Sequence, residues 1–327
     1  MGPAPNGTEH GDGDEPRPSL DFPGQDEVVE RVYGQFGDRL NALASMRDRA
    51  YQELSGLPTT RASFGGTNAY LLMVFGYAIG VLDAARILME HGYGRRALGL
   101  VRTLVDLEID ALLLVANGSE VLERYAAYER WEVAVTAARG LYTLDPDDPV
   151  VAPGVRNRVA DLTQALQEMG VDISGIDDTD LVTALEEFGR HALGKPYPRS
   201  WRDHLNPDEM LDIVAPAHVR TFHPGMESSD PEAFEATVDQ RKRDHKLGYG
   251  LMSSILHASP RTLAQSVQLG ADGYIKAFIV GGDLADVDLA SGMAGLHFYR
   301  IRQIVSLAIG YSGDEDVWDD DFAAIHR

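Results

Sequence analysis

The chain has 327 residues, of which 44% are hydrophobic and 8% aromatic, so it can bury a substantial core. Its 51 acidic residues against 29 basic ones give a formal charge of -22, which opposes binding to nucleic acids and anionic membranes except at a local basic patch. Because the sequence has no cysteine, disulfides, thiolate nucleophiles and cysteine-ligated metal sites are excluded.

The N-terminal segment 1–25 is rich in Pro, Gly and acidic residues, and it lacks the basic start and apolar stretch of a signal peptide. It is predicted to be a disordered tail of a cytoplasmic protein. Helical periodicity then predicts helices at Val28–Leu57 and Asn68–Glu90. The apolar run Tyr70–Leu82 is shorter than the roughly 20 residues that span a bilayer. We therefore expect a core helix and no membrane partner.

Two more helices are predicted, at Arg95–Ala116 and Glu120–Tyr142, separated by Asn117 and Gly118. The connections between most of these four helices are short, and short connections favour antiparallel neighbours. The sequence therefore predicts an antiparallel four-helix bundle over residues 26–143.

The pattern is less regular in residues 153–312. Asp230 and Pro231 form an N-cap and first-turn pair for a helix that we expect to break near Lys246–Gly250. The segment "DGYIKAFIVGGD" is compatible with one short strand but not with a sheet. Further helices are predicted at Val155–Met169, Thr179–Ala192 and Leu284–Tyr311.

The C-terminal segment 313–327 places six acidic residues around Trp318 and Phe322, a composition typical of a solvated tail. The predicted fold class is therefore all-α. It consists of a single multi-helix domain over residues 26–312, with a disordered N-terminal tail and an acidic C-terminal tail.

A charged stripe runs along one predicted helix, where Arg102, Asp106 and Asp110 are four residues apart beside apolar positions. The simplest interpretation is a structural ion pair between Arg102 and Asp106 that fixes the helix against its neighbours. The same residues are also candidates for binding an anion or orienting a base.

A second stripe lies in "GYGLMSSILHASP", where Tyr249, Ser253 and His257 share a helical face. Side chains on a helix lean toward its N-terminus, which works against proton transfer from Ser253 to His257. Ser253 also lacks the flanking glycines of a nucleophile elbow. A hydrogen-bonded core histidine is the simplest interpretation, and a reactive site is the alternative.

Signatures of metal and cofactor binding are missing from the sequence. His218 and His223 lie in a predicted loop with Glu227 and Asp230 nearby, but they match no zinc motif. The glycine-containing segments match neither a phosphate-binding loop nor a dinucleotide fingerprint. We expect no metal and no cofactor.

Four segments resemble, in the same order, the domain of unknown function 5677 family of bacterial helical proteins: "RRALGLVRTLVDLEIDALLL", "RYAAYERWE", "SWRDHLNPDEMLDIVA" and "GYGLMSSILHASP". The resemblance covers roughly residues 65–260, although Asp106 stands where glutamate is expected. It implies a compact helical domain in which the two stripes face each other. The candidate catalytic or binding residues are therefore Arg102, Asp106, Tyr249, Ser253 and His257.

Two functions remain open. The preferred one is a non-catalytic binding or regulatory protein of bacterial stress or defence systems, with a protein partner and with homodimerisation left open. The alternative is a HEPN-like metal-independent ribonuclease of a toxin or phage-defence system, the one case in which RNA would be a partner. Its arginine–histidine spacing occurs at Arg86 with His91 and at Arg199 with His204, as often as chance predicts.

A local basic patch is the best exception to the overall acidity. It consists of Arg241, Lys242 and Arg243, next to His245. Such a patch is where an anionic partner would bind this chain.

Overall fold

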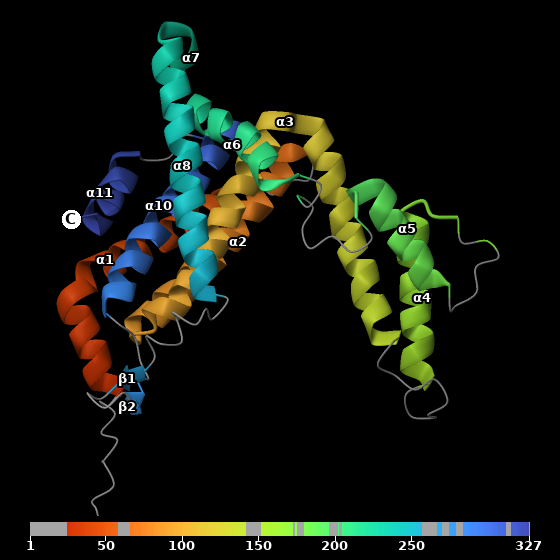
Figure 1. The fold of residues 1–327 in the computed structure, drawn as a ribbon, viewed down its shortest axis with the longest axis horizontal. Coiled ribbons are helices and arrows are strands. Elements are labelled where there is room, and N and C mark those ends of the chain that lie inside the picture. The colour runs from red at the N-terminus through yellow and green to blue at the C-terminus, as the bar shows by residue number, and fades with distance from the viewer. Residues whose placement is uncertain are drawn as a thin grey trace, which may run out of the picture.

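Most of the chain is described by a computed structural model, which covers residues 25–57, 66–141, 152–172, 174, 180–195, 202, 205–256, 267–269, 275–278, 284–311 and 315–326. The predicted N-terminal tail lies outside these residues, apart from Gln25. Helices make up nearly all of the described part, which confirms the all-α fold class (Figure 1).

Helix α2 (Thr67–Glu90) is the centre of the main core. It packs against α1 (Gln25–Gly56), against the first half of α3 (Gly94–Leu141) and against α10 (Leu284–Ile309). Length and composition alone would let α2 cross a membrane, and it is the one such helix in the described ranges. Its buried face packs in the main core, which agrees with the predicted core helix.

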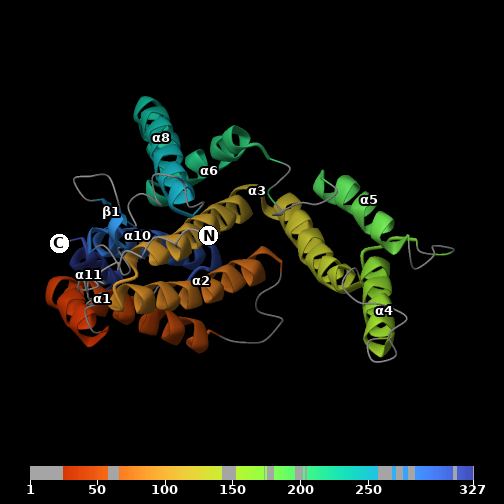
Figure 2. The same ribbon diagram turned by 60° about the horizontal axis from the view of Figure 1, so that its bottom comes forward.

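Helix α3 changes direction at Gly118, whose φ of 52° and ψ of -120° are open to glycine and strained for other residues. Beyond this kink, α3 packs with α4 (Ala152–Glu168) and α5 (Leu181–Leu193) around a second core that contains Trp131. These three segments extend away from the main bundle (Figure 2).

The predicted grouping of the first four helices is therefore wrong. The segment after Gly118 leaves the bundle, although Val121 still contacts the main core. The fourth long helix of that core is α10, which packs on α2 and α3 from far along the chain. The backbone conformation of one glycine decides this grouping, and helical periodicity carries no information about it.

Helix α6 (Pro207–Phe222) and α8 (Pro231–Leu256) form a layer over α3, and the short α7 (Met226–Ser229) packs on both of them. Asn206 starts α6 with a capping box, in which its side chain accepts from the backbone N–H of Glu209 while Glu209 accepts from that of Asn206. Asp230 caps α8 by accepting from the backbone N–H of Ala233 at 3.0 Å.

Two predictions in this layer are wrong. The expected loop around His218 and His223 is largely helical, because α6 runs on to Phe222. The expected break at Lys246–Gly250 is also absent, since α8 is continuous through both of its glycines. A helix tolerates isolated glycines at a cost of about 1 kcal/mol each when tertiary packing supports it.

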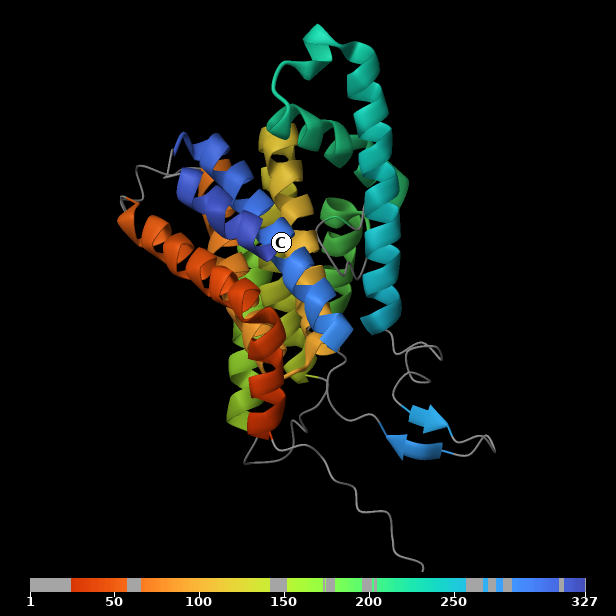
Figure 3. The same cartoon turned by 90° about the vertical axis from the view of Figure 1, so that its left-hand side faces the viewer.

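The predicted short strand is present as β2 (Ile275–Phe278), and it has a partner that the sequence did not suggest. β1 (Val267–Leu269) pairs with it antiparallel, with Val267 opposite Phe278. The hairpin lies beside the bundle rather than inside it (Figure 3).

The C-terminal segment was predicted to be a solvated tail, and this is wrong. Residues Glu315–Ile325 form helix α11, which packs on α1 and α10. Trp318 is only 1% exposed, and the ring of Phe322 stacks on Tyr299 at 4.6 Å between centroids. Trp318, Phe322 and Ile325 are spaced by four and three residues, so they share the inner face, while most of the acids lie outside and Asp321 pairs with Arg49 of α1.

Candidate functional site

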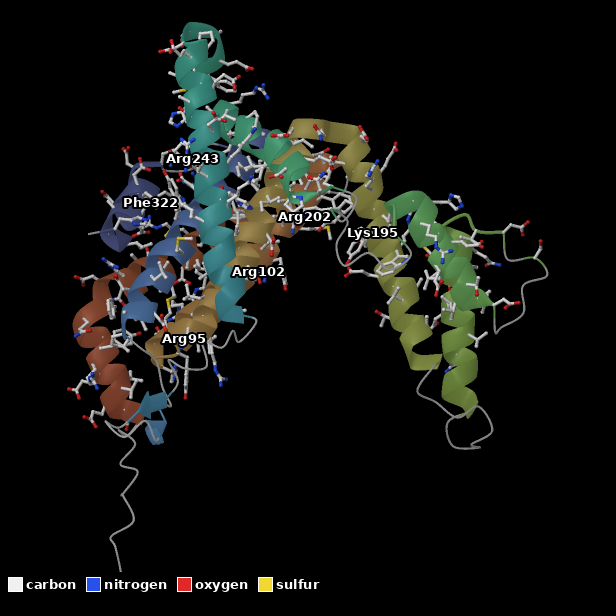
Figure 4. All side chains as sticks on the ribbon, in the orientation of Figure 1. Arg95, Arg102, Lys195, Arg202, Arg243 and Phe322 are labelled. Atoms are coloured by element: carbon white, nitrogen blue, oxygen red, sulfur yellow. The ribbon has the colours of Figure 1, made fainter. Side chains whose placement is uncertain are left out.

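A pocket of about 360 Å³ lies between α3, α6, α8 and α10. Figure 4 labels Arg243, on α8, and Arg202, which precedes α6 in the chain. Both α6 and α8 pack on α3. Polar and charged side chains line one part of the pocket, and these are Glu108, His218, Arg241, Asp244, His245, His297 and Arg300. The remaining wall is apolar and is formed by Val105, Ile109, Leu112, Leu211, Val214, Ala215, Leu247, Met293 and Leu296.

Glu108 is the buried centre of the polar part. It is 6% exposed and follows Leu107 in the most apolar stretch of α3, so the packing of that helix carries a carboxylate into the interior. Its Oε2 accepts a hydrogen bond from Nδ1 of His297 at 2.5 Å. Burial alone would raise the pKa of Glu108, but His297, Arg300 and His218 outweigh burial and lower this pKa to about 2. Glu108 is therefore ionised at neutral pH.

His297 is held in one orientation by this hydrogen bond. Because Nδ1 donates to Glu108, Nε2 is the free ring nitrogen, and in the neutral imidazole it is a hydrogen-bond acceptor. The residue is 8% exposed, and Nε2 has no hydrogen-bond partner among the described residues. A carboxylate-oriented imidazole with a free Nε2 beside a cavity is able to accept a proton from a bound molecule.

His218 lines the opposite wall, on α6. It is 5% exposed, its Nε2 lies 3.7 Å from Oε1 of Glu108, and neither ring nitrogen has a hydrogen bond within the described structure. Burial lowers the pKa of His218 to about 3, although Glu108 acts in the opposite direction. At neutral pH, His218 is therefore an uncharged imidazole with one donor and one acceptor to offer.

Two arginines add positive charge to the pocket. Nη1 of Arg300 lies 3.7 Å from Oε1 of Glu108, and burial lowers the pKa of this guanidinium. Arg241 lies 4.0 Å from Asp244 on the same helix, too far for a hydrogen bond. Both guanidinium groups therefore keep donor capacity for an anion. No three His, Asp or Glu side chains of the described chain are placed to hold a metal ion.

A family model, described as a family of unknown function (DUF5677), matches residues 68–274. The chain belongs to this family. The match confirms the resemblance seen in the sequence, and it includes Glu108, His218 and Arg241 but ends before α10, which carries His297 and Arg300. No curated protein and no solved structure matches the chain.

In this DUF5677 chain, the stripe of Arg102 and Asp106 borders the pocket without lining it. Asp106 accepts from Nη2 of Arg202 at 2.9 Å, and Nε of Arg202 lies 3.2 Å from Asp110. The structure therefore gives Asp106 a partner from the segment before α6 rather than from its own helix. The predicted pairing of Arg102 with Asp106, and the choice between a structural and a functional stripe, stay predictions.

Tyr249 and Ser253 of the second stripe lie on α8, which passes Arg102 in Figure 4 and packs on α3. The described part includes the backbone of Tyr249 and Ser253 but not their side chains, and His257 lies outside it. The two helices that carry the stripes do pack against each other. The convergence of the five side chains stays a prediction.

The predicted basic patch divides between the pocket and the surface. Arg241 and His245 line the pocket, and burial lowers the pKa of His245. Lys242 instead donates to Asp212 at 2.6 Å, and Arg243 bonds the side chain of Gln240.

The arginine–histidine spacings of the ribonuclease alternative gain nothing from the structure. Arg86 forms ion pairs with Asp83 and Glu90 on its own helix, which accounts for its charge. Arg199 and His204 lie outside the described residues.

Sequence reasoning missed Glu108, His297 and Arg300. A signal was present, because each interrupts an apolar helical run: "LVDLEIDALLL" for Glu108 and "GLHFYRIRQIV" for the other two. An ionisable residue inside such a run is either buried with a partner or lines a cavity.

Proposed function

We propose that this protein is a cytoplasmic, non-catalytic binding protein, and that the pocket between α3, α6, α8 and α10 is its ligand site. The observation that carries the proposal is the pair of buried histidines. Both ring nitrogens of His218 and Nε2 of His297 are enclosed without hydrogen-bond partners in the described structure. Leaving a buried polar atom unsatisfied costs about 1–3 kcal/mol, so a ligand that satisfies these atoms would recover that free energy.

Two arginines in the pocket, Arg241 and Arg300, offer donors to an anionic group beside the carboxylates of Glu108 and Asp244. The chain as a whole is acidic, which repels anions over most of its surface. Arg241 and Arg300 provide a local exception, and neither is joined to its neighbouring carboxylate at hydrogen-bonding distance. A volume of about 360 Å³ is in the usual range for a small-molecule site.

Calorimetric titration with a panel of anions tests this proposal. The panel contains inorganic phosphate, carboxylic acids, sugar phosphates and nucleotides, each titrated into the full chain and into Arg241→Ala and Arg243→Ala. We expect saturable binding of at least one organic anion, weakened in Arg241→Ala and unchanged in Arg243→Ala, since Arg243 bonds Gln240 and does not line the pocket. Absence of binding by the whole panel would reject the proposal.

A second candidate function is metal-independent cleavage of RNA, and the hydrogen bond between Glu108 and His297 favours it. A carboxylate that orients an imidazole is the arrangement of a general base, and such a base needs no metal ion to accept a proton from a hydroxyl.

The assay for this second function is cleavage of pooled RNA, without added metal ion, by wild type, His297→Ala and His257→Ala, with melting temperatures measured in parallel. Loss of cleavage in His297→Ala alone, at an unchanged melting temperature, would favour chemistry in the pocket. Loss in His257→Ala alone would place it at the second stripe. Absence of cleavage by the wild type would leave binding as the function of the site.

A further inference from the structure

We propose that the ligand of the pocket is a nucleoside monophosphate, with its phosphate at Arg241 and Arg300 and a ribose hydroxyl between His297 and His218. This inference rests on the proposed function, because it names the ligand class of the same pocket. Three features of the lining carry it: the position of the cations, the hydrogen-bonding capacity of the histidines and the apolar wall.

The cations fit a phosphate group. Arg241 comes from α8 and Arg300 from α10, so the two guanidinium groups reach the pocket from different helices. Each has a carboxylate nearby but beyond hydrogen-bonding distance, at 4.0 Å and 3.7 Å. A phosphate offers oxygen acceptors to both at once, and arginine is the side chain best suited to such contacts.

The histidines fit a hydroxyl group. Glu108 occupies Nδ1 of His297, whose buried Nε2 has no partner among the described residues, while His218 offers one donor and one acceptor. A hydroxyl both donates and accepts, so it can satisfy Nε2 of His297 and a ring nitrogen of His218 together. A carboxylate or a second phosphate oxygen can only accept, so it could pair with donors in this part of the lining but not with acceptors.

The rest of the wall fits a flat and largely apolar ring. Leu112, Leu211 and Val214, together with Met293 and Leu296, belong to the apolar part of the lining. The volume of about 360 Å³ is near the lower end of the range for ligand sites, which suits one nucleotide rather than an RNA strand. The acidity of the chain also disfavours a long polyanion.

The test changes the ligand first and keeps the wild-type chain, so that protein folding cannot affect the result. Calorimetry compares a set of ribonucleoside monophosphates with the corresponding nucleosides, with the dideoxynucleoside monophosphates and with inorganic phosphate. We expect one or more of the monophosphates to bind, and both the nucleoside and the dideoxy analogue to bind at least about tenfold more weakly.

A double-mutant cycle assigns the two ends of the ligand to the two ends of the pocket. In His297→Phe, the difference between the ribose and dideoxyribose ligands should disappear, while the dependence on phosphate remains. In Arg241→Ala, the advantage of the monophosphate over the nucleoside should fall about tenfold, and Arg243→Ala should match wild type. Melting temperatures of all variants exclude those that do not fold.

Two outcomes would overturn the inference, and they are distinguishable from failure of the proposed function. Equal binding of ribose and dideoxyribose ligands would show that no hydroxyl contacts the histidines. Binding of other organic anions but of no nucleotide would reject the nucleotide and leave the binding function intact. If no anion of any kind binds, both proposals fail.

Discussion

Helix α10 carries two buried charged clusters, and they differ in how completely their polar atoms are paired. The latch cluster joins Arg302 to Glu53, Glu315 and Trp318, where α1, α10 and α11 meet. The pocket cluster joins His297 and Arg300 to Glu108 on α3. Both bury a carboxylate beside a cation, so burial and charge alone do not distinguish them.

The polar groups of the latch cluster are paired with one another. Arg302 is 1% exposed, and it donates to Glu53 at 3.1 Å and 3.4 Å and to Glu315 at 2.5 Å. Its guanidinium also lies 5.0 Å from the ring centre of Trp318, whose Nε1 donates to Glu53 at 2.9 Å. Burial by itself would lower the pKa of Arg302, but the hydrogen bonds to the two carboxylates raise it. Each charged or polar group in this cluster therefore interacts with another group of the cluster, which is the pattern of a structural site.

The polar groups of the pocket cluster are only partly paired within the described residues. Only the bond between Glu108 and His297 is short, whereas His218 and Arg300 remain 3.7 Å from the same carboxylate. Three buried ring nitrogens in its described residues have no partner, and they surround a cavity. Incomplete pairing therefore distinguishes the proposed binding site from the structural ion pair, even though both lie on the same helix.

Removing the cation of the latch cluster should have the largest effect. In Arg302→Ala, Glu53 would remain buried with Trp318 as its neutral partner, and breaking a buried pair in this way costs about 3–5 kcal/mol. We expect the free energy of unfolding, measured in urea, to fall by about that amount.

The matched control is Arg300→Ala on the same helix. Glu108 would keep its short bond to His297, so we expect a loss of only about 1 kcal/mol, together with weaker ligand binding. Equal losses of stability in Arg302→Ala and Arg300→Ala would show that the two clusters do not differ in the way described.

Glu108→Gln tests whether the pocket carboxylate contributes stability through its charge. At neutral pH, we expect the free energy of unfolding to fall by about 2 kcal/mol, since a buried charged hydrogen bond is replaced by a neutral one. The folded-state pKa of about 2 lies below the ordinary 4.5, so this contribution is complete above pH 4.5 and is lost as the pH falls from 4.5 toward 2.

Urea unfolding of wild type and Glu108→Gln across this acidic range checks the sign. The difference between the two proteins should shrink steadily as the pH falls. A difference that stays constant would mean that Glu108 is not ionised in the folded protein at neutral pH.

His218→Leu should stabilise the protein, which is the opposite of what a core substitution usually does. Leucine removes two unsatisfied ring nitrogens and keeps the apolar contact with Phe222, so we expect a gain of about 1 kcal/mol near neutral pH. The same variant should lose ligand affinity, because stability and binding compete at such a position.

Acidification should enlarge this gain. The pKa of His218 is lowered from 6.5 to about 3 in the folded protein, so between these values the unfolded chain binds a proton that the folded chain does not. Wild type therefore loses stability as the pH falls through this window, and the leucine variant avoids that loss. A gain that is the same at pH 7 and at about pH 5 would contradict the low pKa of His218.

The long helices could be predicted from the sequence because their apolar residues recur with helical spacing, and α2 and α10 follow the prediction closely. Their grouping could not, because it depends on the φ and ψ of Gly118. Helix α11 does not follow from composition, because a short acidic segment is typical of a solvated tail and only the spacing of Trp318, Phe322 and Ile325 indicates a helix.

The pocket could not be predicted from the sequence, for a different reason. Glu108 and His297 are 189 residues apart, and neither belongs to a short motif. They come together only because α10, rather than the segment after Gly118, packs against α3. A sequence reading could have marked each as an ionisable residue in an apolar helix, but not that the two share a hydrogen bond.

The smallest expected effect comes from Glu315→Gln in the latch cluster. The Glu315 side chain is 49% exposed, so its pair with Arg302 is screened by solvent, and we expect a loss below about 1 kcal/mol that decreases in high salt. Glu53→Gln is the matched change at the buried end, where both Arg302 and Trp318 donate to one carboxylate, and it should cost more. A larger loss of stability in Glu315→Gln than in Glu53→Gln would mean that the latch cluster depends on its contact with α11 rather than on the carboxylate of Glu53 in α1.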